Sequence, residues 1–124
     1  MKPTLGYNDG YTDFTPLLDH PETYRLLSDG EGFAVVLEQS EPGVWQAHTM
    51  ALPEARGKSV QSARYMLEYM FADGANEIWG QTPIDHPAAL KFNEKVGFNP
   101  GDEYEDAAGV MVRRFSLGRD EWTR

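Results

Sequence analysis

The chain has 124 residues, of which 40% are hydrophobic and 25% charged, and its formal net charge is -9. This length and composition predict one folded domain over residues 1–124 and leave no room for a second. The negative charge argues against a surface built to neutralise the phosphates of a nucleic acid. The absence of cysteine excludes disulfides, a thiol nucleophile and a thiolate metal site.

The first part of the chain, residues 1–20, is rich in Gly, Asp, Thr and Tyr and has no clear hydrophobic period. We expect an irregular leader that packs on the body of the domain. No apolar segment typical of a signal peptide begins the chain, and no apolar run approaches the roughly 20 residues that span a bilayer. We therefore expect a cytoplasmic protein that binds neither membranes nor nucleic acids.

The next segment predicts a short helix and then a hairpin. Residues 21–27 predict the helix, with Gly30 beyond its end. Apolar runs at 33–38 and 44–52 flank the turn signal Glu41-Pro42-Gly43 and predict two antiparallel strands.

The rest of the chain alternates helices and strands. The pattern predicts a helix over 59–72, a strand over 77–82, a helix over 87–96, a turn-rich acidic loop over 99–109 and a strand over 110–117. The first helix places Val60, Ala63 and Leu67 at helical spacing, and the second begins at a proline and ends at Gly97. This succession predicts an α+β or α/β domain with a mixed sheet.

A basic turn joins the strand at 44–52 to the helix at 59–72. A strand, a glycine-containing turn and a helix start together present free backbone N–H groups and the positive end of the helix dipole. Arg56-Gly57-Lys58 adds two cations in an otherwise acidic chain. This arrangement favours phosphate binding. The alternative is a solvated turn that is capped by Ser59.

The segments "LPEARGKSV" and "AALKFNEKVGF", which are separated by one helix and one strand, together resemble the cofactor-binding centre of the GNAT superfamily of N-acetyltransferases. The resemblance covers about 45–98. It implies an α+β (α/β/α-like) fold with a mixed, mostly antiparallel sheet. In that fold a central strand, loop and helix bind acyl-CoA, and the acetyl group lies where two neighbouring strands splay apart.

The resemblance also implies a set of site residues, with acetyl-CoA as co-substrate. Main-chain groups at Met50 and Ala51 would contact the pantetheine arm, and His86 and Asn93 occupy positions that in the family contact the cofactor or the reaction centre. The pyrophosphate would lie on the backbone of the loop and first helical turn, formed by Arg56, Gly57, Lys58, Ser59, Val60 and Gln61. No metal is implied.

Several positions differ from the family pattern. Ser59 and Gln61 replace small residues in the phosphate loop, and Asn93 replaces a tyrosine that acts as general acid in many members. The strand that carries a catalytic glutamate in some members offers Gln46 and His48 instead. We expect His48 to act as the general base, with Glu38 and His86 as other candidates. The alternative for His48 is a half-buried histidine that serves packing, and for His86 a residue that caps the following helix.

The function implied is transfer of an acetyl group from acetyl-CoA to an amine, on a small molecule or a protein, by direct attack. The acidic run at 102–106 would attract a cationic amine. The alternative is a catalytically degenerate GNAT-fold protein that binds or assembles, for example a phage structural or accessory protein. The resemblance also allows a homodimer formed through the terminal strands.

Overall fold

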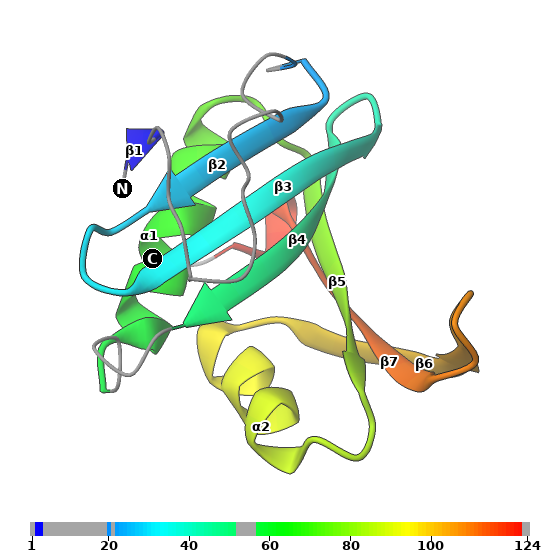
Figure 1. The fold of residues 1–124 in the computed structure, drawn as a ribbon. Helices are drawn as coiled ribbons and strands as arrows, with labels where there is room; N and C mark the ends of the chain where they lie inside the picture. Colours follow the sequence, from blue (N-terminus) through cyan, green and yellow to red (C-terminus); the bar gives the residue numbers. More distant parts are fainter. Residues whose placement is uncertain (1, 4–19, 21, 52–56, 123–124) are drawn as a thin grey trace.

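The computed structural model describes residues 2–3, 20, 22–51 and 57–122. One twisted sheet and two α-helices make up most of this part of the chain (Figure 1). In chain order the elements are β1 (Lys2–Pro3), β2 (Tyr24–Ser28), β3 (Phe33–Glu41), β4 (Val44–Ala51), α1 (Ser59–Ala72), β5 (Glu77–Pro83), α2 (Pro87–Val96), β6 (Asn99–Glu105), β7 (Met111–Gly118) and the 3₁₀ helix η3 (Arg119–Glu121).

The sheet has the strand order β1-β2-β3-β4-β5-β7-β6. Every neighbouring pair is antiparallel except β4 and β5, which run parallel because α1 carries the chain back across the sheet between them. The prediction of an α+β fold with a mixed, mostly antiparallel sheet is therefore confirmed. The predicted helices over 59–72 and 87–96 are confirmed as well.

The core lies between the sheet and α1. Alternate side chains of β3, at Phe33, Val35 and Leu37, are fully buried and share one cluster with Met66 and Met70 of α1. Burying a side chain of this size contributes roughly 1.5–3 kcal/mol. Because successive strand residues point to opposite faces, this cluster defines which residues of the sheet face α1. It also covers one side of the site described below.

The helix predicted over 21–27 is wrong. Residues Tyr24–Ser28 form β2, which pairs along its whole length with β3, from Tyr24 opposite Glu38 to Ser28 opposite Ala34. Leu26 and Leu27 are both buried although they point to opposite faces, so each face of this strand is covered. Strand pairing and burial on both faces override the weak helical pattern of so short a segment.

The loop predicted over 99–109 is also partly wrong. Residues Asn99–Glu105 form β6, which pairs with β7 and contains an irregularity between Pro100 and Glu103. The strand is polar because it lies at the edge of the sheet and is largely exposed, and a proline is tolerated in an edge strand. The turn that follows is held by Asp106 Oδ1, which accepts hydrogen bonds from the backbone N–H groups of Ala108 and Val110, each at 2.9 Å.

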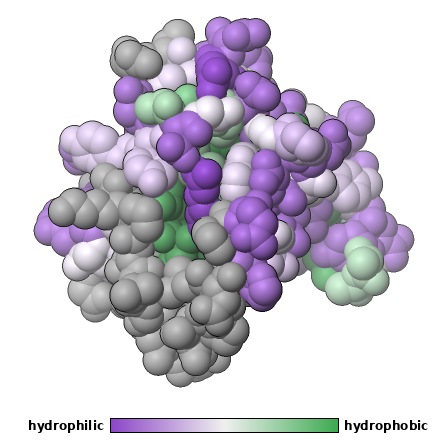
Figure 2. Space-filling model, turned by 90° about the horizontal axis from the view of Figure 1, so that it is seen from above, coloured by the Kyte–Doolittle hydropathy of each residue, from purple (hydrophilic) through white to green (hydrophobic). Residues whose placement is uncertain are grey.

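Of the predicted leader, residues 4–19 lie outside the described part of the chain. Lys2 and Pro3 pair with Ser28 and Leu27 and add β1 to the edge of the sheet. The described surface is mostly hydrophilic when viewed from above, with a narrow hydrophobic strip in a hollow between polar side chains (Figure 2). This surface agrees with the strongly negative net charge of the chain.

Candidate active site

The parallel strands β4 and β5 pair over only a short length. Three residue pairs join them, the last being Gln46 with Trp79, and beyond this point the strands diverge (Figure 1). The divergence leaves part of the backbone edge of each strand without its neighbour. Main-chain N–H and C=O groups at such an edge are available to a ligand that lies between the strands. The predicted splayed strand pair is thus present.

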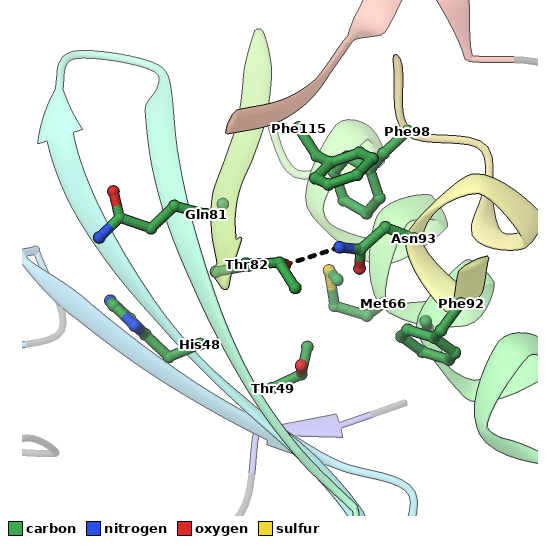
Figure 3. A pocket seen from close by; sticks show the side chains of 12 residues that line it. His48, Thr49, Met66, Gln81, Thr82, Phe92, Asn93, Phe98 and Phe115 are labelled. Carbon is green, nitrogen blue, oxygen red and sulfur yellow. Dashed lines mark hydrogen bonds between the residues drawn. The ribbon is translucent and has the colours of Figure 1, made fainter. Parts of the chain in front are cut away.

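A cavity of about 250 Å³ lies at this divergence. Its apolar wall is formed by Met66 of α1, Phe92 of α2, Phe98 and Phe115, and polar groups of β4, β5 and α2 complete it (Figure 3). The remaining lining residues are Ala47, His48, Thr49, Ala63, Gly80, Gln81, Thr82 and Asn93. Apolar side chains beside well-placed polar groups are the usual lining of a site for a small molecule or a cofactor arm.

The polar groups of the cavity belong to two faces of the sheet. Thr82 lies on the face toward the helices, where its Oγ1 accepts a hydrogen bond of 2.8 Å from Asn93 Nδ2 (Figure 3). His48 and Gln81 lie on the opposite face, because they alternate with Ala47 and Thr82 along their strands. The residues that line the cavity therefore come from both faces of the sheet, with the splay between them.

The structure places the candidate base His48 at the rim of this cavity. Its side chain is exposed rather than half-buried, and strand alternation puts it on the same face as Gln46. The packing alternative expected a half-buried side chain, which the exposed His48 is not. Glu38, another candidate base, lies on β3 opposite Gln46 and does not line the cavity.

Met50 and Ala51 end β4 at the splay, opposite Ala34 and Phe33 of β3. Their backbone continues β4 beyond its last pair with β5. Arg56 lies outside the described part of the chain. The other residues of the predicted phosphate-binding loop, from Gly57 onward, are described.

The turn at Gly57 leads directly into α1. Gly57 has a φ of +85°, which favours glycine, and a Cβ at this position would find no atom of the described residues within 4 Å. Lys58 is the N-cap and makes no capping hydrogen bond with its side chain, so the alternative of a turn capped by Ser59 is not what the structure shows. Ser59 is instead the first helical residue. Among the described residues, no capping side chain satisfies the free backbone N–H groups in the first turn of α1.

Two acidic residues lie near this helix start. The Nζ atom of Lys58 is 3.6 Å from Glu31 Oε2, and both side chains are more than half exposed. In the next turn, Ser62 Oγ donates a hydrogen bond of 2.5 Å to Asp29 Oδ2. Any anion bound at the start of α1 would compete with Glu31 for Lys58.

Asp29 ties the β2–β3 turn to α1. Its Oδ1 accepts hydrogen bonds from the backbone N–H groups of Glu31, at 2.7 Å, and Phe33, at 3.1 Å. Burial raises the pKa of Asp29, but the hydrogen bonds from Ser62 and from these backbone groups together outweigh burial and lower the pKa below its ordinary value. The turn signal Ser28-Asp29-Gly30 was visible in the sequence, but its partner Ser62 was not.

Of the remaining predicted site residues, Gln61 and His86 do not line the cavity and Asn93 does. Gln61 is exposed on α1 and donates a hydrogen bond of 3.1 Å from its Nε2 to the hydroxyl of Tyr65. His86 is the N-cap of α2, where its Nδ1 accepts from the backbone N–H of Ala89 at 3.3 Å, and it does not line the cavity. The capping alternative for His86 thus describes its observed contact. Asn93 does line the cavity.

Sequence reasoning missed several residues at the splay. Thr49, Gln81 and Thr82 line the cavity, and the hydroxyl of Tyr104 donates a hydrogen bond of 2.6 Å to Gln81 Oε1. Tyr104 lies in the stretch that was expected to be a solvated acidic loop. Because β6 and β5 are separated by β7, only the register of three strands brings Tyr104 to Gln81.

Comparison with known proteins gives a match in structure and none in sequence. The sequence matches no family model and no curated protein. A mutant form of the spermidine N-acetyltransferase SpeG from Vibrio cholerae superposes with a TM-score of 0.71 at 16% identity, over 94% of this chain and 83% of that one. The chain has the GNAT acetyltransferase fold.

Other GNAT structures support the same assignment. An acetyltransferase of the GNAT family from Bacillus anthracis matches with a TM-score of 0.66 at 12% identity, over 79% of this chain and 66% of that one. At these identities the likeness establishes the fold. In this chain β4, which splays from β5, is followed in the sequence by the start of α1.

Two further properties of the described residues concern membrane spanning and metal binding. Neither α-helix in the described residues has the length and apolar character that a membrane span needs. Within the same residues, no three His, Asp or Glu side chains are grouped so that they could hold a metal ion.

Proposed function

We propose that the protein is an N-acetyltransferase that moves an acetyl group from acetyl-CoA to an amine. The observation that carries this proposal is the cavity at the splay of β4 and β5, followed in the chain by the Gly57 turn and the start of α1. A GNAT fold supports the same reading. Acetyl-CoA would supply a thioester whose carbonyl carbon is attacked by the neutral amine.

The residues at the start of α1 fit a pyrophosphate. Its first turn carries uncapped N–H groups, Lys58 adds a cation, and the space beside Gly57 is open. Glu31 opposes this fit, since it already pairs with Lys58. The exposed edge of β4 at Met50 and Ala51 would then hold the amide groups of the pantetheine arm by main-chain hydrogen bonds.

His48 is the residue that we propose as general base. It lies at the rim of the cavity, on the sheet face opposite Thr82 and Asn93, so an amine could approach it from that face. Asn93 cannot donate a proton to a departing thiolate, and its amide nitrogen is already bound to Thr82. Water is therefore the proton donor in this proposal.

The experiment measures thiol release from acetyl-CoA in the presence of a panel of amines. We expect turnover with at least one amine, and we expect His48→Ala to lower kcat by about 10²–10⁴-fold, the usual contribution of a general base. The dissociation constant of acetyl-CoA, measured by calorimetry, should stay unchanged in His48→Ala. Full activity of this variant would remove His48 from the mechanism.

A second candidate function is a GNAT-fold binding or assembly protein, of which a phage accessory protein would be one case. Asn93 in place of a proton-donating side chain and the Lys58–Glu31 pair favour this reading. It predicts no turnover with any amine. Thermal unfolding separates the two cases further, because acetyl-CoA at 100 times its Kd should stabilise a protein that binds it by about 2.7 kcal/mol.

A further inference from the structure

The face of the sheet away from α1 carries two polar side chains at the mouth of the splay. The last parallel pair is Gln46 with Trp79, and His48 and Gln81 lie two residues beyond it on their strands. Strand alternation therefore puts all four on this face. Both His48 and Gln81 line the cavity, and in Figure 3 both project to the side away from Met66 and Asn93.

The amide group of Gln81 is held in one orientation. Its Oε1 accepts the hydrogen bond of 2.6 Å from Tyr104, so this oxygen is turned toward β6. The amide nitrogen then points toward the side on which His48 lies (Figure 3). A glutamine fixed in this way presents two N–H donors to a molecule in the mouth of the splay.

Two charged side chains, Arg114 and Glu77, lie on the same face as Gln81. Arg114 lies opposite Gln81 on β7, its guanidinium is 4.0 Å from the ring centroid of Trp79, and its Nη2 is 3.3 Å from Glu77 Oε2. The carboxylate of Glu77 is therefore engaged by a cation.

Two other carboxylates lie nearby. Glu103 neighbours Tyr104 but points to the opposite face, where it binds Arg113. Glu38 shares the face of His48 but lies opposite Gln46, toward the closed end of the splay. Of the described residues on this face, His48 and Gln81 line the cavity, and no carboxylate does.

We propose that Gln81 determines which amine is acetylated, by donating hydrogen bonds to a carbonyl or carboxylate oxygen beside that amine. This inference rests on the acetyltransferase function proposed above. The acceptor class is then an α-amino carbonyl compound, such as a peptide N-terminus or an amino acid. A polyamine has no carbonyl or carboxylate oxygen to accept the hydrogen bonds that Gln81 offers. Tyr104 is a positioning residue in this scheme.

The test compares four amines with the full chain and acetyl-CoA: a tripeptide with a free α-amine, alanine, spermidine and butylamine. We expect kcat/KM for the tripeptide or alanine to exceed that for spermidine and butylamine by at least about tenfold, as expected when a site loses a hydrogen-bonding partner. The tripeptide and alanine arms distinguish a peptide from a free amino acid.

Three variants test the residues. Gln81→Glu keeps the size but replaces the donors with a carboxylate, so it should lower kcat/KM for the preferred substrate by at least about tenfold and raise it for spermidine. Tyr104→Phe should raise KM for the preferred substrate by about three- to tenfold and leave butylamine unchanged, because only the orientation of Gln81 is lost. Tyr69→Phe, a matched change on α1, should alter neither value.

The outcomes separate the two proposals. Preference for spermidine in the unmodified protein, or an unchanged preference in Gln81→Glu at unchanged melting temperature, would overturn this inference while acetyl transfer itself stands. Absence of turnover with all four amines would overturn the proposed function, and this inference with it.

Discussion

Asp29 is expected to stabilise the domain by joining the β2–β3 turn to α1. Its carboxylate accepts three hydrogen bonds, from Ser62 and from the backbone of Glu31 and Phe33. Asp29→Ala removes the acceptor for all three and leaves two backbone N–H groups to be satisfied by water. Hydrogen bonds to a charged group are worth about 1.5–3 kcal/mol each when buried, and less where water can replace the partner. We therefore expect a loss of about 2–4 kcal/mol, which is large beside a typical total of about 5–15 kcal/mol.

The dependence on pH follows from the direction of the pKa shift. The pKa of Asp29 is lower in the folded chain than its ordinary value, despite the opposing effect of burial. Its contribution is therefore complete above the ordinary value of about 3.9 and disappears as the pH falls through the lower, folded value. The difference in stability between the unmodified protein and Asp29→Ala should be constant from neutral pH to about pH 5 and should shrink below about pH 4.

The assay is urea unfolding followed by circular dichroism at several pH values. Asp102→Ala is the matched control, because Asp102 is exposed on the edge strand β6 and its removal should change stability by less than about 0.5 kcal/mol. A loss in Asp29→Ala no larger than that of the control would refute the reasoning. So would a difference that persists undiminished in acid, since it would then arise from something other than the ionised carboxylate.

Two further predictions concern the start of α1. Replacing both Arg56 and Lys58 by alanine should weaken acetyl-CoA binding by about 1–3 kcal/mol, because charge-assisted contacts to the pyrophosphate are lost; unchanged affinity in calorimetry would place the cofactor elsewhere. Glu31→Gln should instead strengthen acetyl-CoA binding by up to about fivefold, because it frees Lys58 from an exposed pair worth up to about 1 kcal/mol. The gain from Glu31→Gln should fall with added salt, and a loss of affinity would show that Glu31 supports the site rather than opposing it.

Elements with a strong local signal were predictable from the sequence. The helix at 59–72 has a long apolar period, and the helix at 87–96 is bounded by a proline and Gly97. By contrast, β2 is five residues long, and its apolar pattern fits either structure until its pairing with β3 is known. The polar edge strand β6 has no apolar period at all, because most of its residues are exposed.

The sequence could locate only those residues of the candidate site that lie on consecutive elements of the chain. The strand, turn and helix that place His48, Gly57 and Lys58 are consecutive in the sequence, so a local pattern could locate them. Gln81 and Tyr104 could not be connected in this way, since their hydrogen bond depends on the pairing of β5 with β7 and of β7 with β6. An acidic stretch with one tyrosine gives no sign of which residue contacts Gln81.

The short pairing of β4 with β5 also divides the sheet mechanically. On one side lie β1 to β4 and on the other β5, β7 and β6, and each half is entirely antiparallel. Three residue pairs join the halves along the sheet. A molecule bound in the splay, as the proposed function requires, would touch both halves at once and extend this seam beyond Gln46 and Trp79. It would then hold the two halves together, so ligand binding would raise the cooperativity of unfolding.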